Sequence, residues 1–278
     1  MKPTDVVLSI ARKELSDRLR NRWIWTVSAL LALSALAIAF FGSAPVGVVG
    51  VQRTGAAMAS LMNLAVYLVP LLALILGCGA LIEEKQRGTL DLILVYPLST
   101  VEFFFGTFLG FALALAVAVV SGFVLSGAVL SLWAGVDAGE YLVMVALALM
   151  LGVVFLALAF LLSILAKDRG RAVASSVLVW ICTIFIFDLL LVGVLILSKG
   201  KVSTGLFSVL LLLNPTDVFR MLCFKWIGSA ASPLGLAAVI PSGLSTALFT
   251  GVLVLWMAVP LFLSYALFQR RVANDTLA

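Results

Sequence analysis

The chain has 278 residues and a net charge of +5, and 64% of its residues are hydrophobic whereas 11% are charged. Soluble domains carry roughly 25% charged residues, so this composition, with a mean hydropathy of +1.24, excludes an ordinary soluble domain. Histidine is absent, which excludes chemistry that depends on a histidine base or a histidine-bound zinc ion.

Residues 1–23 have the pattern of an amphipathic helix. Apolar residues recur every three or four positions, at Leu8, Ala11, Leu15, Leu19 and Trp23. Arginine and lysine fill most positions between them, which predicts a helix that lies on the membrane surface with its basic side toward anionic headgroups. A cleaved signal peptide is disfavoured, because the next apolar run exceeds the usual length of roughly 7–15 residues.

Six apolar runs follow, and each is long enough to cross a hydrocarbon core of about 30 Å. They span residues 24–41, 61–82, 103–133, 142–166, 172–197 and 244–268. We therefore expect an all-α polytopic membrane protein that forms one transmembrane domain over residues 1–278. In the third run, Gly106 and Gly110 are one helical turn apart, which favours close helix packing.

The distribution of basic residues predicts the orientation. An even number of spans places both termini on one side, and that side also receives the loop at residues 83–99. Most of the 18 lysine and arginine residues fall there. The positive-inside rule therefore predicts that both termini and this loop are cytoplasmic.

The polar loop at residues 83–99 has the pattern of a short helix between two stops. Gly88 can end the preceding helix, Thr89 can cap a new one, and Pro97 ends it. Three apolar residues share one face of this short helix: Leu90, Ile93 and Leu94. Such a helix suits docking into a groove of another protein. The alternative is an ordinary loop whose charges hold the helix ends at the interface.

Two further cytoplasmic features flank the spans. Ser99 and Glu102 have the spacing of a capping box that opens the third apolar run. The charged loop at residues 167–171 is either a second contact with a partner or an interface anchor.

The outer connection at residues 198–243 contains a helix start signal. Asn214, Pro215 and Asp217 combine an N-cap, a proline at the first helical position and an acid in the first turn. Four residues then share a face: Phe219, Leu222, Cys223 and Trp226. We expect a short helix at or dipping into the outer leaflet. It either gates an exit and receives a partner, or anchors the chain through Trp226.

Asp188 is the acid that lies well inside a predicted span. A carboxylate is costly in the membrane, which makes it a functional candidate. It could relay a proton or meet a polar substrate. Alternatively, it is protonated or hydrogen-bonded to a hydroxyl group of a neighbouring helix and has no role in transport.

The sulfur-containing residues give weaker signals. Met58 and Met62 are one turn apart, and their thioethers are soft ligands for Cu(I), but core packing is the better interpretation. Cys78, Cys182 and Cys223 are scattered without metal-ligand spacing. Cys78 and Cys182 lie inside apolar runs, where a small buried hydrophobe is the expected role. We expect no metal or cofactor bound by this chain.

An ATP-binding phosphate loop requires lysine followed by serine or threonine, and none of the lysines has such a neighbour. No catalytic constellation is visible either, so we expect a chain that is not itself an enzyme. If ATP drives it, a separate subunit must hold the ATP and magnesium.

The loop sequence resembles a known family. The run Glu-Glu-Lys-x-x-Gly-Thr-Leu-x-Leu-Ile-Leu-x-x-Pro-Leu-Ser, residues 83–99, resembles the cytoplasmic coupling segment of type-2 ABC permeases. The resemblance extends to the basic helix at residues 10–23. It implies ATPase-coupling roles for the following residues: Glu83, Glu84, Arg87, Gly88, Thr89, Leu90, Asp91, Leu94 and Pro97. Leu90 and Leu94 would fill the groove of the ATPase.

Residues 213–220 further resemble the members of this family that serve the maturation of nitrous oxide reductase, a copper enzyme of denitrifying bacteria. The resemblance implies a homodimer in the bacterial inner membrane, a partner ATPase and a periplasmic maturation subunit. The candidate contact with that subunit is the set Asn214, Pro215, Asp217 and Arg220. The cargo would be a sulfur species or copper, and no nucleic acid is involved.

Two alternatives from other classes stay open. An ABC exporter of lipid, polysaccharide or drug would share the coupling segment. A proton-coupled secondary carrier that uses Asp188 would need no ATPase.

Overall fold

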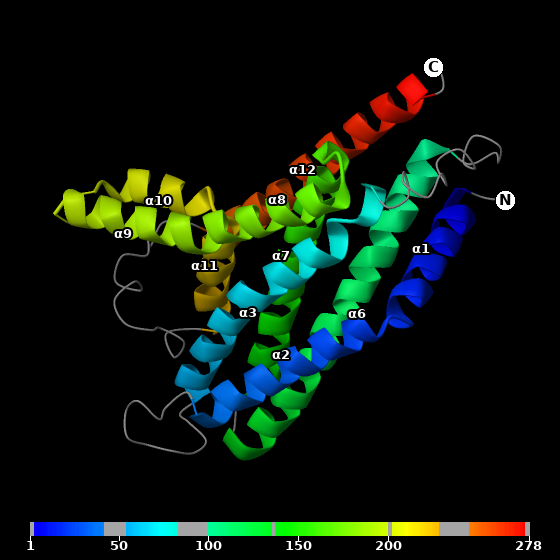
Figure 1. Ribbon diagram of the computed structural model, residues 1–278. Helices are drawn as coiled ribbons and strands as arrows, with labels where there is room; N and C mark the ends of the chain where they lie inside the picture. The colour runs from blue at the N-terminus through cyan, green and yellow to red at the C-terminus, as the bar shows by residue number, and fades with distance from the viewer. Residues whose placement is uncertain are drawn as a thin grey trace.

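A computed structural model describes residues 3–41, 54–82, 99–134, 137–199, 202–227 and 245–275. Within these ranges the chain forms helices and no strand (Figure 1). The helices are α1 Pro3–Leu19, α2 Arg22–Phe41, α3 Thr54–Gly77, α6 Thr100–Ala134, α7 Ala138–Leu165, α8 Arg169–Ile181, the π-helix η2 Cys182–Ile186, α9 Phe187–Leu197, α10 Thr204–Leu212, α11 Pro215–Ile227 and α12 Thr246–Asp275.

The prediction of an all-α polytopic membrane protein is confirmed. Five described helices are long and apolar enough to cross a membrane: Met58–Ile82, Thr100–Ala128, Ala138–Leu165, Arg169–Leu197 and Thr246–Ala273. They correspond to five of the six apolar runs. The first run forms α2, whose apolar stretch Ile24–Ala37 is shorter than the others in the described part of the chain. A bent pair, α10 and α11, could supply one further broken span.

Helix α7 lies at the centre of the fold and packs against α3, α6, α11 and α12. It is apolar on all sides, as expected of a helix that other helices surround. Phe160 of α7 makes edge-to-face contacts with three rings of α6, with centroid distances of 5.2 Å to Phe108, 5.4 Å to Phe111 and 6.0 Å to Phe104. These aromatic contacts stabilise the α6–α7 pair beyond their buried area.

Helix α1 packs along α6 (Figure 1), and the glycine pair permits their close approach. A Cβ atom built on Gly110 would lie 2.5 Å from Cβ of Glu14 and 2.8 Å from the Ala11 carbonyl oxygen. The predicted apolar face of α1 is wrong in part. Ala11 is buried as expected, but Leu8 is 63% exposed and Glu14 is buried instead. The glycines select which face of α1 contacts α6, and that face is not the most apolar one.

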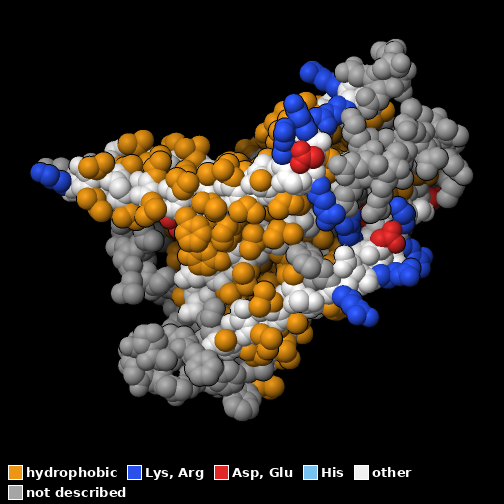
Figure 2. All heavy atoms as spheres, in the orientation of Figure 1, with side chains coloured by type: hydrophobic (Ala, Val, Ile, Leu, Met, Phe, Trp, Pro, Cys, Tyr) orange, Lys and Arg blue, Asp and Glu red, His pale blue; other side chains and the backbone are white. Residues whose placement is uncertain are grey.

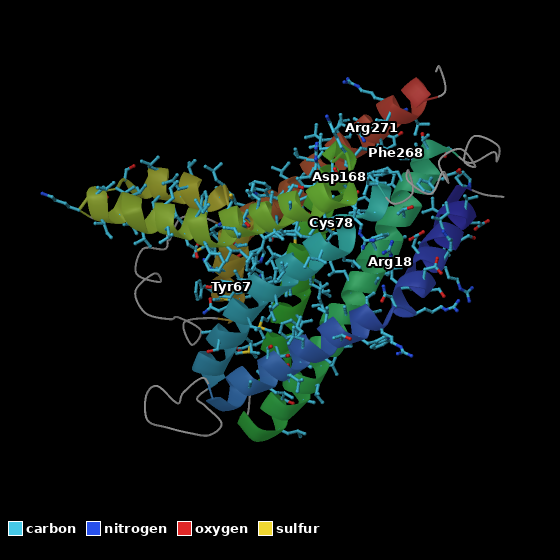
Figure 3. The ribbon with its side chains drawn as sticks, in the orientation of Figure 1. Arg18, Tyr67, Cys78, Asp168, Phe268 and Arg271 are labelled. Atoms are coloured by element: carbon cyan, nitrogen blue, oxygen red, sulfur yellow. The ribbon has the colours of Figure 1, made fainter. Side chains whose placement is uncertain are left out.

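Basic side chains gather at one end of the molecule. Figure 2 shows lysine and arginine around α1, the start of α8 and the C-terminal part of α12. In Figure 3, Arg18, Asp168 and Arg271 lie toward this end, which is also where α6 begins. We call this the basic end. Its composition agrees with the predicted cytoplasmic side, and the orientation itself stays a prediction.

Candidate functional site

The span Arg169–Leu197 contains a π-helix near its middle. The Phe187 amide donates to the Cys182 carbonyl oxygen, five residues earlier, instead of to the Thr183 carbonyl oxygen. The Thr183 carbonyl oxygen thereby loses its usual helical donor and accepts a hydrogen bond from Nδ2 of Asn214 at 2.8 Å. π-Helical turns often occur at functional sites. Here the turn provides an acceptor for a residue from another helix.

The Asn214 side chain caps the start of α11 and also binds the π-helix. Its Oδ1 accepts hydrogen bonds from the Thr216 amide at 3.1 Å and from the Thr216 hydroxyl at 2.8 Å, while its amide group donates to Thr183. Pro215 follows as the first helical residue. The predicted helix start is confirmed, and the same side chain also attaches α11 to the π-helix.

Helix α11 enters the protein rather than lying flat on it. Its axis is bent by 110° from that of α10, and it packs against α7 and α12. Phe219, Leu222 and Cys223 are buried as the shared face predicts, but Trp226 is 59% exposed. The predicted dipping helix is therefore present as a re-entrant or broken segment. Trp226, at its far end, lies outside the packed face.

Three charged side chains meet between α9 and α11. Nη1 of Arg220 donates to Oδ1 and Oδ2 of Asp188 at 3.1 Å and 3.0 Å, and to Oδ1 of Asp217 at 2.9 Å. The exposed fractions of the side chains are 13% for Arg220, 5% for Asp217 and 33% for Asp188. Buried charges are tolerated when they are paired in this way. We call Asp188, Asp217 and Arg220 the charge cluster.

The charge cluster is incompletely satisfied within the described part of the chain. Oδ2 of Asp217 and Nε of Arg220 are both buried and have no hydrogen-bond partner among the described residues. Buried polar groups are paired in the great majority of native structures. The charge cluster therefore keeps one buried acceptor and one buried donor that the described residues do not use.

The observed partner of Asp188 differs from the predicted one. The sequence predicts a hydroxyl group of a neighbouring helix as a hydrogen-bond partner, whereas the structure provides the Arg220 guanidinium. The missed signal was an arginine in an amphipathic helix that dips into the membrane, because such a charge needs an acid of opposite sign.

The residues proposed for a periplasmic contact lie inside this fold. Asn214, Pro215 and Asp217 are buried, and Arg220 is occupied by the two carboxylates. These side chains therefore do not form an exposed surface of the chain. A partner that approaches this turn would first meet Leu213, which is half exposed. The partner contact itself stays a prediction.

The π-helical region is also attached to α3. Nε1 of Trp180 donates to the Tyr67 carbonyl oxygen at 3.0 Å, and the Tyr67 and Phe185 rings stack with centroids 6.1 Å apart. Figure 3 shows Tyr67 near the crossing of α3 with the α8–α9 span. Helix α3 therefore contacts the same membrane span that carries Asp188.

The predicted coupling residues lie outside the described residues, but both flanks of the loop are described. The amides of Leu81 and Ile82 donate to the buried hydroxyl of Ser163 in α7 at 3.1 Å and 3.2 Å. On the other flank, the Ser99 amide donates to Glu102 Oε2 at 3.0 Å, and the Glu102 amide donates to Ser99 Oγ at 3.2 Å. The predicted capping box is confirmed. The loop thus leaves from and returns to fixed helix ends.

The sulfur-containing residues lie mainly in the core. Met58 and Met62 are both buried, in agreement with core packing. Cys78 is buried as expected, whereas the expected burial of Cys182 is wrong, because this residue of the π-helix is exposed. Cys223 of α11 is also buried.

Known proteins resemble the chain over almost its full length. Residues 8–272 match the family described as "ABC-2 family transporter protein". A protein of Pseudomonas aeruginosa named "Probable ABC transporter permease protein NosY" is 42% identical over 273 residues, which cover 96% of this chain and 98% of that protein. A protein of the same name from Stutzerimonas stutzeri is 41% identical over 274 residues, covering 95% of this chain and 98% of that protein.

Proposed function

This chain belongs to the ABC-2 transporter family as a permease subunit, and we propose that it serves an ATP-driven transporter for the maturation of nitrous oxide reductase. The observation that carries the proposal is the 42% identity, across nearly the whole chain, to a protein named as a probable NosY permease. The resemblance of residues 213–220 to the permeases of that maturation system supports the same assignment.

A separate ATPase would supply the energy. The chain lacks a phosphate loop, and the segment at residues 83–99 has the sequence expected of the ATPase-coupling element. In this proposal the apolar side chains of Leu90 and Leu94 dock in the ATPase, and closure of the ATPase dimer around ATP and magnesium pushes on the short helix.

The described contacts suggest how that movement would travel. Ser163 holds the helical residues Leu81 and Ile82, which follow the turn after α3, against α7, and the Ser99–Glu102 capping box holds the start of α6. Helix α7 in turn packs against α11, which carries Asp217 and Arg220. A push at the coupling segment would therefore reach the charge cluster through packed helices. There, α11 and α9 would change their relative position.

The assembly would be a homodimer with two ATPases and a periplasmic maturation subunit. Apolar side chains of the α8–α9 span and of α12 are largely exposed in the single chain, which leaves surface for a second copy as well as for lipid. The periplasmic subunit would contact the turn between α10 and α11. In the bacterial inner membrane, the basic end and both termini would face the cytoplasm.

The cargo would be a sulfur species exported for the copper–sulfide centre, or the transporter would drive the delivery of copper. An ABC exporter of lipid, polysaccharide or drug is the remaining candidate. Complementation of a strain that lacks the permease separates the two, because only the maturation role restores the spectrum of the copper–sulfide centre. Membership of an ABC family argues against a secondary carrier that uses Asp188.

The coupling proposal is tested by affinity purification from native membranes in mild detergent. The wild type should retain an ATPase, and Leu90→Glu/Leu94→Glu should lose it, because a carboxylate is costly in an apolar groove. Leu8→Glu is the matched control, since Leu8 is an exposed leucine of α1. Size-exclusion chromatography verifies that each variant is folded.

The outcomes separate the two parts of the proposal. If the double variant keeps the ATPase, residues 90 and 94 are not the docking face. If the wild type retains no ATPase under conditions that preserve the complex, the ATP-driven assembly itself is wrong.

A further inference from the structure

Five aromatic rings join the start of α6 to the C-terminal part of α12. Phe103, Phe104 and Phe105 come from the first two turns of α6, and Tyr265 and Phe268 come from α12. Measured between ring centroids, Phe104 lies 5.5 Å from Tyr265 and 5.8 Å from Phe268. Phe103 lies 6.0 Å from Phe268, and Phe105 lies 5.7 Å from Tyr265. We call these five rings the aromatic bridge.

The aromatic bridge adjoins the point where the predicted coupling segment ends. The Phe103 amide donates to the carbonyl oxygen of Ser99, the last residue of that segment, at 3.1 Å. Helix α12 packs chiefly against α7 and α11 and only slightly against α6, and the aromatic bridge is where it reaches α6. Phe104 and Phe268 are 0% and 3% exposed, so these rings are close-packed. Close-packed side chains resist compression, so a displacement of the start of α6 would move α12 with it.

The N-terminal half of α12 contacts the turn between α10 and α11. Nε1 of Trp256 donates to the carbonyl oxygen of Leu212 at 3.2 Å. Leu212 is the last residue of α10 and lies shortly before Asn214, which caps α11. Phe249 of α12 and Leu222 of α11 are fully buried in one apolar cluster. The turn is therefore attached to α12 as well as to the π-helix.

One continuous helix connects these two contacts. Trp256 and Phe268 are about 18 Å apart along α12, given the helical rise of about 1.5 Å per residue. Figure 1 shows α12 running from α11 toward the end of the molecule where α6 begins, and Figure 3 places Phe268 toward that end. Pro260 lies between the two contacts and can bend the helix. Met257 and Leu261 pack against the core on the two sides of Pro260, so the core supports α12 across this bend.

We propose that α12 transmits movement of the coupling segment to the turn between α10 and α11. The aromatic bridge is its contact with the start of α6, and Trp256 is its contact with the turn. Tyr265, Phe268 and Trp256 are then positioning residues for transport. This inference rests on the proposed function, because it requires an ATPase that pushes on residues 83–99. It does not depend on the proposed cargo.

The test uses the full chain with its ATPase in lipid nanodiscs. Hydrogen exchange at the turn between α10 and α11 is compared without nucleotide and with ATP trapped by vanadate. We expect ATP to change this exchange in the wild type. Phe268→Leu should lose most of the ATP-dependent change, because leucine fills much of the volume without the ring contacts. Trp256→Phe should lose it too and, without nucleotide, should speed exchange at the turn about fivefold, as for the loss of one hydrogen bond.

Two matched controls separate transmission from a merely structural role. Phe123→Leu removes a fully buried ring of α6 that lies outside the aromatic bridge. Trp25→Phe removes an indole hydrogen bond of the same kind, which Nε1 of Trp25 donates to the Leu19 carbonyl oxygen at 2.9 Å. Both controls should keep the ATP-dependent change at the turn. If the rings and the indole only stabilised the fold, each control would reduce this change as much as its counterpart in α12.

Copurification of the ATPase distinguishes the failure of this inference from the failure of the proposed function. If the wild type retains no ATPase, the proposed function is wrong and transmission through α12 is wrong with it. If the ATPase is retained and both α12 variants keep the full ATP-dependent change, only the role of α12 is overturned. The same holds if ATP changes nothing at the turn in the wild type. Trp256→Phe is a mild substitution, so the test remains decisive even if Phe268→Leu does not fold.

Discussion

Replacement of Arg220 with methionine removes the cation that contacts both Asp188 and Asp217. Removal of one partner of a buried ion pair costs about 3–5 kcal/mol, because it leaves an uncompensated charge. Asp217 is nearly fully buried and would experience this cost, whereas Asp188 is one-third exposed and would be partly hydrated. We therefore expect Arg220→Met to lower the free energy of unfolding by about 3 kcal/mol, at the lower end of that range.

The matched variant is Asp188→Asn. Its amide oxygen still accepts a hydrogen bond from Arg220, and the 2.9 Å pair between Arg220 and Asp217 remains. The expected cost is about 1 kcal/mol, the net value of a typical hydrogen bond. The double variant should cost less than the sum of the two single variants, because residues in direct contact are energetically coupled.

Unfolding is measured on the purified chain in mixed micelles, by titration with a denaturing detergent and by the fluorescence of its six tryptophans. If Arg220→Met costs no more than Asp188→Asn, Arg220 does not compensate a buried charge. If the two effects are additive, the two side chains are not in contact.

Three further predictions use the same unfolding assay. Gly110→Val should destabilise the chain by about 1–3 kcal/mol through overpacking against α1. Gly193→Val should be nearly neutral, because a Cβ atom added at Gly193 meets no atom within 4 Å. Equal effects of the two variants would contradict the close approach of α1 to α6. Ser163→Ala should cost about 1–3 kcal/mol and speed hydrogen exchange at the amides of Leu81 and Ile82. Unchanged exchange at these two amides would exclude this anchor. Asn214→Ser should retain the helix cap and lose the hydrogen bond to Thr183. It should therefore lower the free energy of unfolding by about 1 kcal/mol less than Asn214→Ala does. Identical losses would show that the cap contributes nothing.

The sequence by itself determined the features that depend on neighbouring residues. The apolar runs specified an all-α membrane protein, because backbone groups in a bilayer must be satisfied within each helix. The Ser99–Glu102 capping box and the Asn214 helix start were also predictable. Their hydrogen bonds form within a single turn, so that spacing alone defines them.

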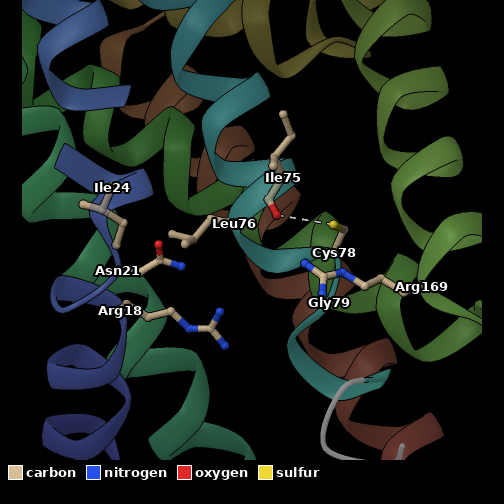
Figure 4. Close-up of a pocket in the computed structure, with 8 residues that line it drawn as sticks. All are labelled: Arg18, Asn21, Ile24, Ile75, Leu76, Cys78, Gly79 and Arg169. Carbon is tan, nitrogen blue, oxygen red and sulfur yellow. Dashed lines mark hydrogen bonds between the residues drawn. The ribbon is translucent and has the colours of Figure 1, made fainter. Parts of the chain in front are cut away.

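The tertiary structure decided which helices meet and through which faces. Periodicity identified an apolar stripe on α1, but Gly110 selected the face that carries Glu14, since glycine permits the closest approach of two backbones. Asp188 and Arg220 lie on different helices with a sharp bend between them, so their pairing could not be read from spacing. The pocket that is lined by residues of α1, α3 and α8 has the same origin (Figure 4). Contacts between residues far apart in the chain depend on the packing of whole helices, and local sequence patterns carry no information about that packing.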